Sequence, residues 1–255
     1  MAKINILKID SEQRKKAEDI VTDEVPLTIH LNGEELLTLL CSPEDLKELC
    51  AGLLYSTGLI RSAKEIRNII IDRQNWTSSI ETKAKDLTSK LMFKRLYTPG
   101  CGKGILFYNP MDAVHKKKMI NGLKIPSGKV LKLMDSFQRS SVSFKETGGV
   151  HSAALSEGDN ILIFKEDIGR HNALDKVIGE ALIKGLNMEG AIALTTGRIS
   201  SEIISKIERM RAHILISRSA PTDQAVKLAE GLNLTLIGFA RGERMNVYTA
   251  KERIA

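Results

Sequence analysis

The sequence predicts an α/β protein in which a mixed, largely parallel sheet is covered by helices and follows a smaller α+β region at the N-terminus. Three observations lead to this prediction. The chain has 255 residues, of which 42% are hydrophobic, enough for one large domain or two small ones. After residue 126, strand and helix patterns alternate with short connections, which is typical of parallel sheets covered by helices. The earlier part shows a strand hairpin and one apolar helix instead.

The N-terminal region is expected to start with strands. Its first residues, up to about Asp23, are polar and are expected to be frayed. Apolar residues over 27–37 surround an Asn32-Gly33 pair, which indicates a hairpin with a type I′ turn. A helix is expected from Ser42, with proline in its first turn, to a stop at Gly58.

Two poorly patterned stretches, 72–90 and 109–124, flank the segment around Cys101. This segment, 97–104, is rich in glycine and is expected to be an exposed, mobile loop. The pattern changes after Pro126, so a domain boundary is expected there. The predicted division is an α+β region over 1–125, which carries the Cys101 loop, and an α/β domain over 126–255.

The second region is expected to begin with a helix capped by Ser127. Strands over 150–155 and 161–164 follow, joined by a turn at 157–160. Helices over 173–184, 201–211 and 222–231 are then expected to alternate with strands over 191–195, 214–217 and 234–239. A last strand, 245–249, is expected to close an edge of the sheet.

Arginines stand after successive predicted strands, where open α/β sheets bind their ligands. They lie in the segments 166–171, 195–200, 217–222 and 239–244, together with glycines and helix-starting Ser or Thr residues whose backbone N–H groups can bind anions. For any one arginine, an exposed side chain at a helix end remains the alternative. The set predicts a phosphorylated ligand held at one rim by Arg170, Arg198, Arg218, Arg241 and Arg244.

Histidines and acids lie in or near the same segments. His151 follows a Gly-Gly pair that permits close approach of the backbone to a ligand, and His171 lies in the first arginine segment. Both are site candidates, and either could be an ordinary hydrogen-bonding histidine. Glu166, Asp167 and Asp175 could recognise a nucleobase or a ribose hydroxyl, or could cap helices. For Asp175 the structural role is preferred.

Cys101 is the candidate for covalent chemistry. Basic residues at 94, 95 and 103 flank it and favour the thiolate, the nucleophilic form of cysteine. A thiolate can accept sulfane sulfur as a persulfide and pass it on by exchange. An incidental exposed thiol is the alternative. Cys41 and Cys50 lie beside or within an apolar helix and are expected to be buried thiols.

The composition narrows the class of protein. The 38 Lys and Arg residues exceed the 31 Asp and Glu residues and give a net charge of +7, which favours anionic partners. Nucleic acid is not expected, because only 4% of residues are aromatic and no recognition motif is present. No apolar run is long enough for a bilayer and no signal pattern is visible, so a cytoplasmic protein without membrane association is expected. No Walker A loop, paired zinc-binding cysteines or nucleophile elbow is present, and no metal site is predicted.

Five segments together resemble the FdhD family of formate dehydrogenase accessory sulfurtransferases: 147–154, 166–176, 196–201, 217–222 and 238–248. The resemblance, over about residues 24–248, implies a cytidine-deaminase-like fold and a homodimer. It also implies that sulfur from a cysteine desulfurase is carried as a Cys101 persulfide to the molybdenum bis-molybdopterin guanine dinucleotide cofactor of formate dehydrogenase. The C-terminal domain would bind this cofactor, which a guanine nucleotide would mimic, near Phe239, Ala240, Arg241, Gly242, Glu243 and Arg244.

Two features depart from related patterns. The family usually has a Cys-x-x-Cys pair in this loop, whereas Gly104 occupies the second position here, so a relay between two cysteines of one loop is impossible. His151 is not followed by the glutamate of zinc deaminases, so deamination is not expected. The leading prediction is sulfur transfer through Cys101. The alternative is a non-catalytic cofactor-binding chaperone for formate dehydrogenase.

Overall fold

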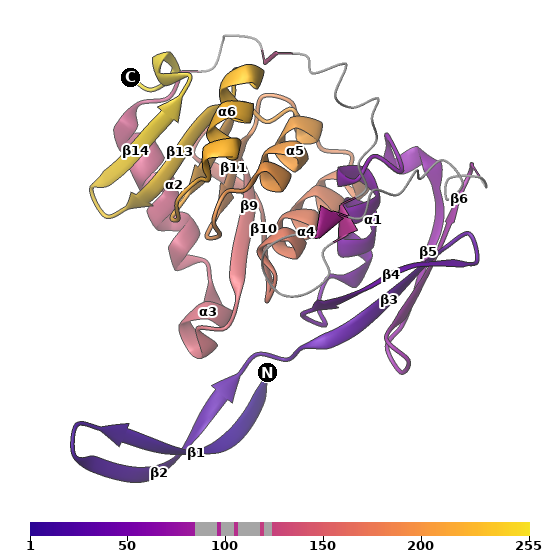
Figure 1. Cartoon of the computed structure of the whole chain (residues 1–255), viewed down its shortest axis with the longest axis vertical. Coiled ribbons are helices and arrows are strands. Elements are labelled where there is room, and N and C mark those ends of the chain that lie inside the picture. The colour runs from indigo at the N-terminus through magenta and orange to yellow at the C-terminus, as the bar shows by residue number, and fades with distance from the viewer. Residues whose placement is uncertain (85–95, 98–104, 107–117, 120–123) are drawn as a thin grey trace.

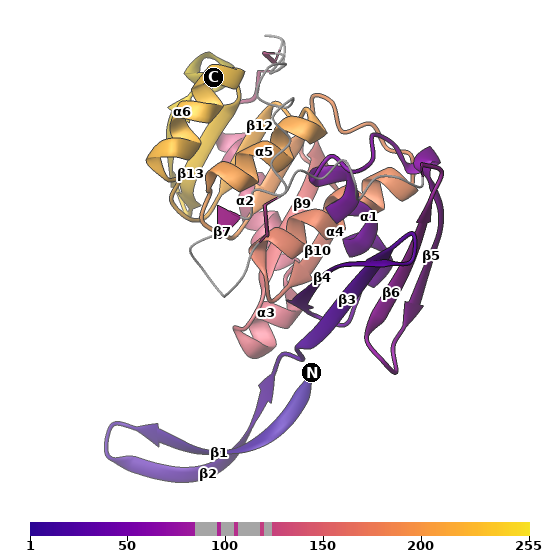
Figure 2. The same cartoon turned by 45° about the vertical axis from the view of Figure 1, so that its right-hand side comes forward.

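The structure, a computed structural model, describes residues 1–84, 96–97, 105–106, 118–119 and 124–255. A six-stranded mixed sheet with helices forms the main body, and a four-stranded sheet lies beside it (Figure 1 and Figure 2). The predicted α/β class with an α+β N-terminal region is confirmed. Two short strands, β7 (Leu96–Tyr97) and β8 (Ile105–Leu106), pair with each other. Cys101 and the rest of its predicted loop lie outside the described residues.

The six-stranded sheet has the order β10-β9-β11-β12-β13-β14. Its central strands β11, β12 and β13 are parallel, whereas β9 and β14 pair antiparallel with their neighbours. Each of the predicted strands is present, with ends that differ by up to three residues. Their bounds are β9 His151–Glu157, β10 Asn160–Asp167, β11 Ile192–Thr195, β12 Ile214–Ser217, β13 Thr235–Arg241 and β14 Arg244–Thr249.

Helices cover this sheet on two sides (Figure 1). α4 (Arg170–Ile183), α5 (Ser201–Met210) and α6 (Asp223–Leu232) pack on one face, and α2 (Ser127–Arg139) packs on the other. A short helix, α3 (Val142–Thr147), connects α2 to β9. No helix in the part of the chain that the structure describes is long and apolar enough to cross a membrane.

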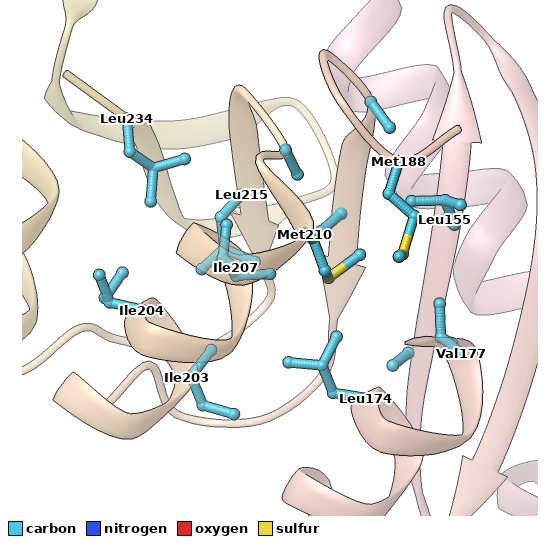
Figure 3. Close-up of a cluster of buried hydrophobic side chains, with 14 of the residues drawn as sticks. Leu155, Leu174, Val177, Met188, Ile203, Ile204, Ile207, Met210, Leu215 and Leu234 are labelled. Carbon is cyan, nitrogen blue, oxygen red and sulfur yellow. The ribbon is translucent and has the colours of Figure 1, made fainter. Parts of the chain in front are cut away.

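Aliphatic and methionine side chains fill the space between α4, α5 and the sheet (Figure 3). Ile203, Ile207 and Met210 recur at the spacing of one helix face and lie near Leu174 of α4 and Leu215 of β12. This packing holds α4 and α5 against the sheet. Since each of these helices begins a few residues after a strand ends, their N-termini lie at the carboxyl ends of the strands.

The N-terminal region is a four-stranded sheet of order β4-β3-β6-β5, with α1 (Leu46–Ser56) packed on one face. The predicted hairpin is confirmed, because Asn32 and Gly33 have φ angles of 52° and 90°, as a type I′ turn requires. The bounds are β3 Val25–Leu31, β4 Glu34–Cys41, β5 Ile66–Asp72 and β6 Thr77–Thr82, with a 3₁₀ turn at Ala63–Glu65 and another near the C-terminus at Lys251–Arg253.

α1 and α4 touch through their backbones. A Cβ atom on Gly52 would lie 1.8 Å from the carbonyl oxygen of Asp175, and a Cβ atom on Gly179 would lie 1.8 Å from the carbonyl oxygen of Glu48. Only glycine fits at these two positions, because any Cβ atom would overlap the backbone of the facing helix. This contact joins the N-terminal sheet to the helix layer of the main body.

The residues before Asp23 are not frayed, contrary to the sequence prediction. They form a hairpin of β1 (Ala2–Asp10) and β2 (Gln13–Val21) that extends away from the body (Figure 1). The polar composition concealed it, because β2 is mostly charged and only Ile6, Ala17 and a few residues near the base are shielded from solvent. At that base, Thr22 hydrogen-bonds to Thr147 over 2.8 Å.

Two further predictions for the N-terminal region are corrected. α1 begins at Leu46 and not at Ser42, because long-range bonds hold Ser42 outside the helix. The Ser42 N–H donates to Asp167 at 3.1 Å, and its hydroxyl accepts the Ile168 N–H at 3.1 Å. The stretch after residue 72 contains β6, whose pattern is weak because two of its three buried residues are Ser78 and Thr82.

Candidate functional site

Strand ends meet at one edge of the main sheet. β9 pairs antiparallel with both β10 and β11, so β10 runs in the same direction as β11, β12 and β13. The carboxyl ends of these four strands therefore lie together with the first residues of β9 and β14. We call this the strand-end edge; it comprises residues 151–152, 166–171, 195–200, 217–222 and 239–244. Every predicted site residue except Cys101 lies on it.

All five predicted arginines lie along the strand-end edge. Arg198, Arg218, Arg241 and Arg244 are exposed, whereas Arg170 is half-buried as the first residue of α4. Neither helix start has a side-chain cap within the described structure: Gly169, before α4, has no side chain, and Ser200, before α5, makes no cap hydrogen bond. This combination of guanidinium groups and helix N-termini can bind an anion.

The segment 239–244 is a bulged hairpin. β13 runs to Arg241, two residues beyond its predicted end, and its register with β14 shifts between Gly238 and Arg241. Phe239 has a φ of 54°, which is uncommon for a bulky residue, and its N–H donates to the Ser219 carbonyl at 3.1 Å. Arg241 and Arg244 pair directly across the ladder, with Gly242 and Glu243 exposed in the turn between them and Ala240 buried before it. The bulge could not be predicted from the sequence, because phenylalanine rarely adopts a positive φ.

Gly197 provides the surface on which the Arg170 side chain rests. A Cβ atom at Gly197 would lie 2.7 Å from Cβ and 2.8 Å from Cδ of Arg170. Any side chain at this position would displace the aliphatic stem of the arginine. Gly197 is itself held by its N–H, which donates to Thr195 Oγ1 at 3.1 Å, and by its carbonyl, which accepts the Ser217 hydroxyl proton at 2.7 Å.

His151 is the first residue of β9 and lies at the strand-end edge. Its Nδ1 atom lies 3.2 Å from Oγ1 of Thr196, a residue that was not singled out from the sequence. Burial, and secondarily the positive charge of Arg170, lower the pKa of His151 below its usual value. At neutral pH the ring is therefore uncharged.

His171 faces α5 instead of lying free on the edge. Its Nε2 atom is 3.5 Å from the Glu202 carboxylate and has no hydrogen-bond partner among the described residues. Burial, followed by the charges of Lys206 and Arg170, lowers its pKa to about 3, so the pair is not an ion pair at neutral pH. Burial raises the pKa of Glu202. The contact between His171 and Glu202 could not be predicted from the sequence, because the two residues are far apart along the chain.

Acidification is expected to destabilise the protein through His171. Between pH 6.5 and about 3 the unfolded chain binds a proton that the folded ring excludes, so the free energy of unfolding falls as the pH drops through this window. His171→Gln removes this contribution and should flatten the pH dependence of urea unfolding. Glu202→Gln is the control with the opposite sign: its raised pKa favours the folded state at low pH, so its loss should steepen the dependence. An unchanged slope in His171→Gln would contradict the prediction.

Asp175 has the structural role that was preferred for it. It is buried, and its carboxylate accepts hydrogen bonds from Lys206 Nζ at 2.7 and 2.8 Å and from the Ser56 hydroxyl at 2.7 Å. The interaction links α1, α4 and α5 below the strand-end edge. Asp175 is thus removed from any ligand at the surface.

Asp167 is also part of the framework. It and Lys176 are completely buried and form an ion pair of 2.7 Å. Gly169 N–H, Asn172 Nδ2 and Ser42 N–H donate to the remaining positions of the Asp167 carboxylate at 2.8, 2.9 and 3.1 Å. Its neighbour Glu166 accepts hydrogen bonds from Ser141 and Ser143. The sequence left open whether Glu166 and Asp167 recognise a ligand or support the fold, and in the structure both support the fold.

Cys41 and Cys50 are buried thiols, as expected. Burial raises the pKa of Cys41 to about 12 and that of Cys50 to about 11, so neither forms a thiolate at neutral pH. Within the residues that the structure describes, no cluster of three or more His, Cys, Asp or Glu side chains is arranged to hold a metal ion.

Known proteins resemble this chain over nearly its whole length. A model of the FdhD/NarQ family matches residues 22–255. The chain belongs to the FdhD/NarQ family. It is 41% identical over 251 residues to the sulfur carrier protein FdhD of Bacillus subtilis (strain 168), covering 98% of this chain and 96% of that protein. It is also 41% identical over 243 residues to the sulfur carrier protein FdhD of Listeria monocytogenes serovar 1/2a, covering 94% and 93% of the two chains.

A solved structure has a similar fold. The crystal structure of a formate dehydrogenase accessory protein from Desulfotalea psychrophila superposes with a TM-score of 0.80 at 26% sequence identity. The superposition covers 100% of this chain and 99% of the Desulfotalea chain. The family resemblance drawn from the five sequence segments is thus confirmed.

Proposed function

We propose that this FdhD/NarQ protein is a sulfur carrier required for formate dehydrogenase activity. The observation that carries the proposal is its identity of 41–42% to sulfur carrier proteins FdhD of two Bacillus species over 98% of its length. Similarity at this level over the full chain supports a shared activity. The proposed place of action is the cytoplasm, with a cysteine desulfurase as sulfur donor, formate dehydrogenase as recipient, and a homodimer as the working form.

Cys101 is the residue proposed to carry the sulfur, so that the protein acts as a sulfurtransferase. Its thiolate attacks the terminal sulfur of the desulfurase persulfide, forming a new sulfur–sulfur bond while the bond to the desulfurase cysteine breaks and that cysteine leaves as a thiolate. The oxidation state of the sulfur pair is conserved, so this step needs no outside oxidant. Since Cys41 and Cys50 are buried with raised pKa values, they are poor competitors for the incoming sulfur.

The strand-end edge is proposed to hold the substrate, the molybdenum bis-molybdopterin guanine dinucleotide cofactor, through its guanine dinucleotide part. The proposed ligand residues are 239–244, His151, Arg170, Arg198 and Arg218. Support comes from the exposure of four arginines and from the uncapped starts of α4 and α5 beside them. Arginine pairs with phosphate through two parallel hydrogen bonds, which suits a dinucleotide with its pyrophosphate.

Mass spectrometry of the intact protein tests the sulfur step. After incubation with a cysteine desulfurase and cysteine, the wild-type protein should gain the mass of sulfur and Cys101→Ala should gain none, because the acceptor thiolate is missing. Cys50→Ala, which removes a buried thiol, is the matched control and should load normally. Equal loading of Cys101→Ala and wild type would refute the carrier role.

A cofactor-binding chaperone without sulfur transfer is the second candidate, and Gly104 favours it because the second cysteine of the family's usual Cys-x-x-Cys pair is missing. A formate dehydrogenase maturation assay with the same variants separates the two. Full maturation by Cys101→Ala, combined with GDP binding that is lost in Arg241→Ala, would favour the chaperone. Failure of maturation in Cys101→Ala with normal GDP binding would favour the carrier.

A further inference from the structure

Thr196 lies where the β9–β11 ladder ends at the strand-end edge. Its N–H donates to the Ser152 carbonyl at 3.0 Å, and its hydroxyl oxygen accepts the Ser152 N–H at 3.0 Å. The same oxygen lies 3.2 Å from Nδ1 of His151. A single side chain thus contacts both the backbone of β9 and the ring of its first residue.

The one proton of the Thr196 hydroxyl has two possible acceptors. The Ser152 carbonyl is 3.5 Å away, at the limit of a hydrogen bond, and it already accepts the Thr196 N–H. Nδ1 of His151 is nearer, at 3.2 Å, and has no other hydrogen-bond partner among the described residues. Donation to Nδ1 is therefore preferred.

The preferred bond determines where His151 carries its own proton. The ring is neutral at pH 7, because burial and Arg170 lower its pKa. A neutral ring that accepts a hydrogen bond at Nδ1 must be protonated at Nε2. Nε2 makes no hydrogen bond to the described residues, so this N–H remains available to a ligand.

We propose that Thr196 is a positioning residue that holds His151 as the Nε2–H tautomer, so that His151 donates a hydrogen bond to a phosphate oxygen of a guanine nucleotide. The ligand part of this inference rests on the proposed function. Arg170 supplies charge beside His151, and the neighbouring Gly197 gives the arginine its place. Thr196 thus orients the His151 ring, and Gly197 leaves room for the Arg170 side chain, so the two residues position both donors. The opposite tautomer would leave a lone pair at Nε2, which repels a phosphate oxygen.

GDP binding measured by calorimetry tests this role. Thr196→Val is expected to weaken binding about tenfold, the effect of misplacing one hydrogen bond to a charged group. Thr196→Ser keeps the hydroxyl and should bind as the wild type does. In a His151→Ala background, Thr196→Val should cause no further loss, because Thr196 acts through His151. A further tenfold loss in that background would overturn the positioning role.

Nitrogen NMR of the His151 ring without nucleotide provides a readout that is independent of ligand binding. The wild type and Thr196→Ser should show Nδ1 unprotonated and Nε2 protonated, and Thr196→Val should show a mixture. A wild-type ring protonated at Nδ1 would overturn the inference. Absence of GDP binding by the wild type would overturn the nucleotide assignment both here and in the proposed function. The NMR measurement needs no nucleotide, so it would still test whether Thr196 fixes the tautomer of His151.

Discussion

Gly179→Ala is expected to lower the free energy of unfolding by about 3 kcal/mol or more, toward the upper end of the cost of overpacking a core. The added methyl carbon would lie 1.8 Å from the Glu48 carbonyl oxygen and 2.6 Å from the carbonyl carbon. These atoms belong to the backbone of α1 and cannot move aside as the end of a flexible side chain can. α1 and α4 would have to separate, which would disturb the packing along both. Urea unfolding monitored by circular dichroism measures the change.

Gly231→Ala is the matched control for this prediction. Gly231 is also inside a helix, α6, but a Cβ atom there would meet nothing within 4 Å. Alanine is favoured over glycine in helices by about 1 kcal/mol, so the control should be neutral or stabilising. Similar destabilisation by both substitutions would show that helix separation is not the cause.

Lys176→Met is expected to cost about 3–5 kcal/mol, because it leaves the buried Asp167 carboxylate without its counter-charge. Methionine has nearly the same length and fills the same space, so the loss reports the charge of Lys176 and its hydrogen bonds to the Glu166 and Ser42 carbonyls, and not its volume. Lys227→Met is the control. Lys227 pairs with Asp223 over 3.6 Å in an exposed i,i+4 arrangement, where such a pair contributes about 0.3–0.5 kcal/mol.

A second substitution separates loss of charge balance from loss of packing. Asp167→Asn in the Lys176→Met background removes the remaining buried charge while the amide keeps one oxygen for the surrounding N–H donors. We expect the double variant to be more stable than Lys176→Met alone. A double variant that is less stable than Lys176→Met would contradict the view that the unpaired carboxylate causes the loss.

The sequence predicted the main sheet well for a simple physical reason. β11 and β12 are short apolar runs between amphipathic helices, and such runs have few alternatives to the centre of a covered sheet. Once these strands are parallel, the arginines that follow them must share an edge. The position of the strand-end edge therefore followed from local patterns, even though single strand ends were displaced by a few residues.

Contacts between distant segments could not be predicted in this way. Ser42 has the local pattern of a helix cap, but its bonds to Asp167 and Ile168 prevail. Lys176 lies in a predicted helix, where nothing nearby in the sequence indicates burial, yet it is completely buried because Asp167 pairs with it there. The meeting of His171 with Glu202 likewise depends on how α4 packs against α5. Each case needs the tertiary structure, since neither partner indicates the other along the chain.

The β1–β2 hairpin has a consequence for solubility. Within the described structure neither outer edge of this hairpin has a neighbouring strand, and Leu7 and Ile9 are 56% and 58% exposed, a combination that promotes strand addition between molecules. Across the ladder these residues face Lys16 and Arg14, and Lys8 faces Lys15 between them. Lysine and arginine side chains on an exposed strand edge oppose the addition of another strand, so these residues counter the growth of an intermolecular sheet from this end of the protein.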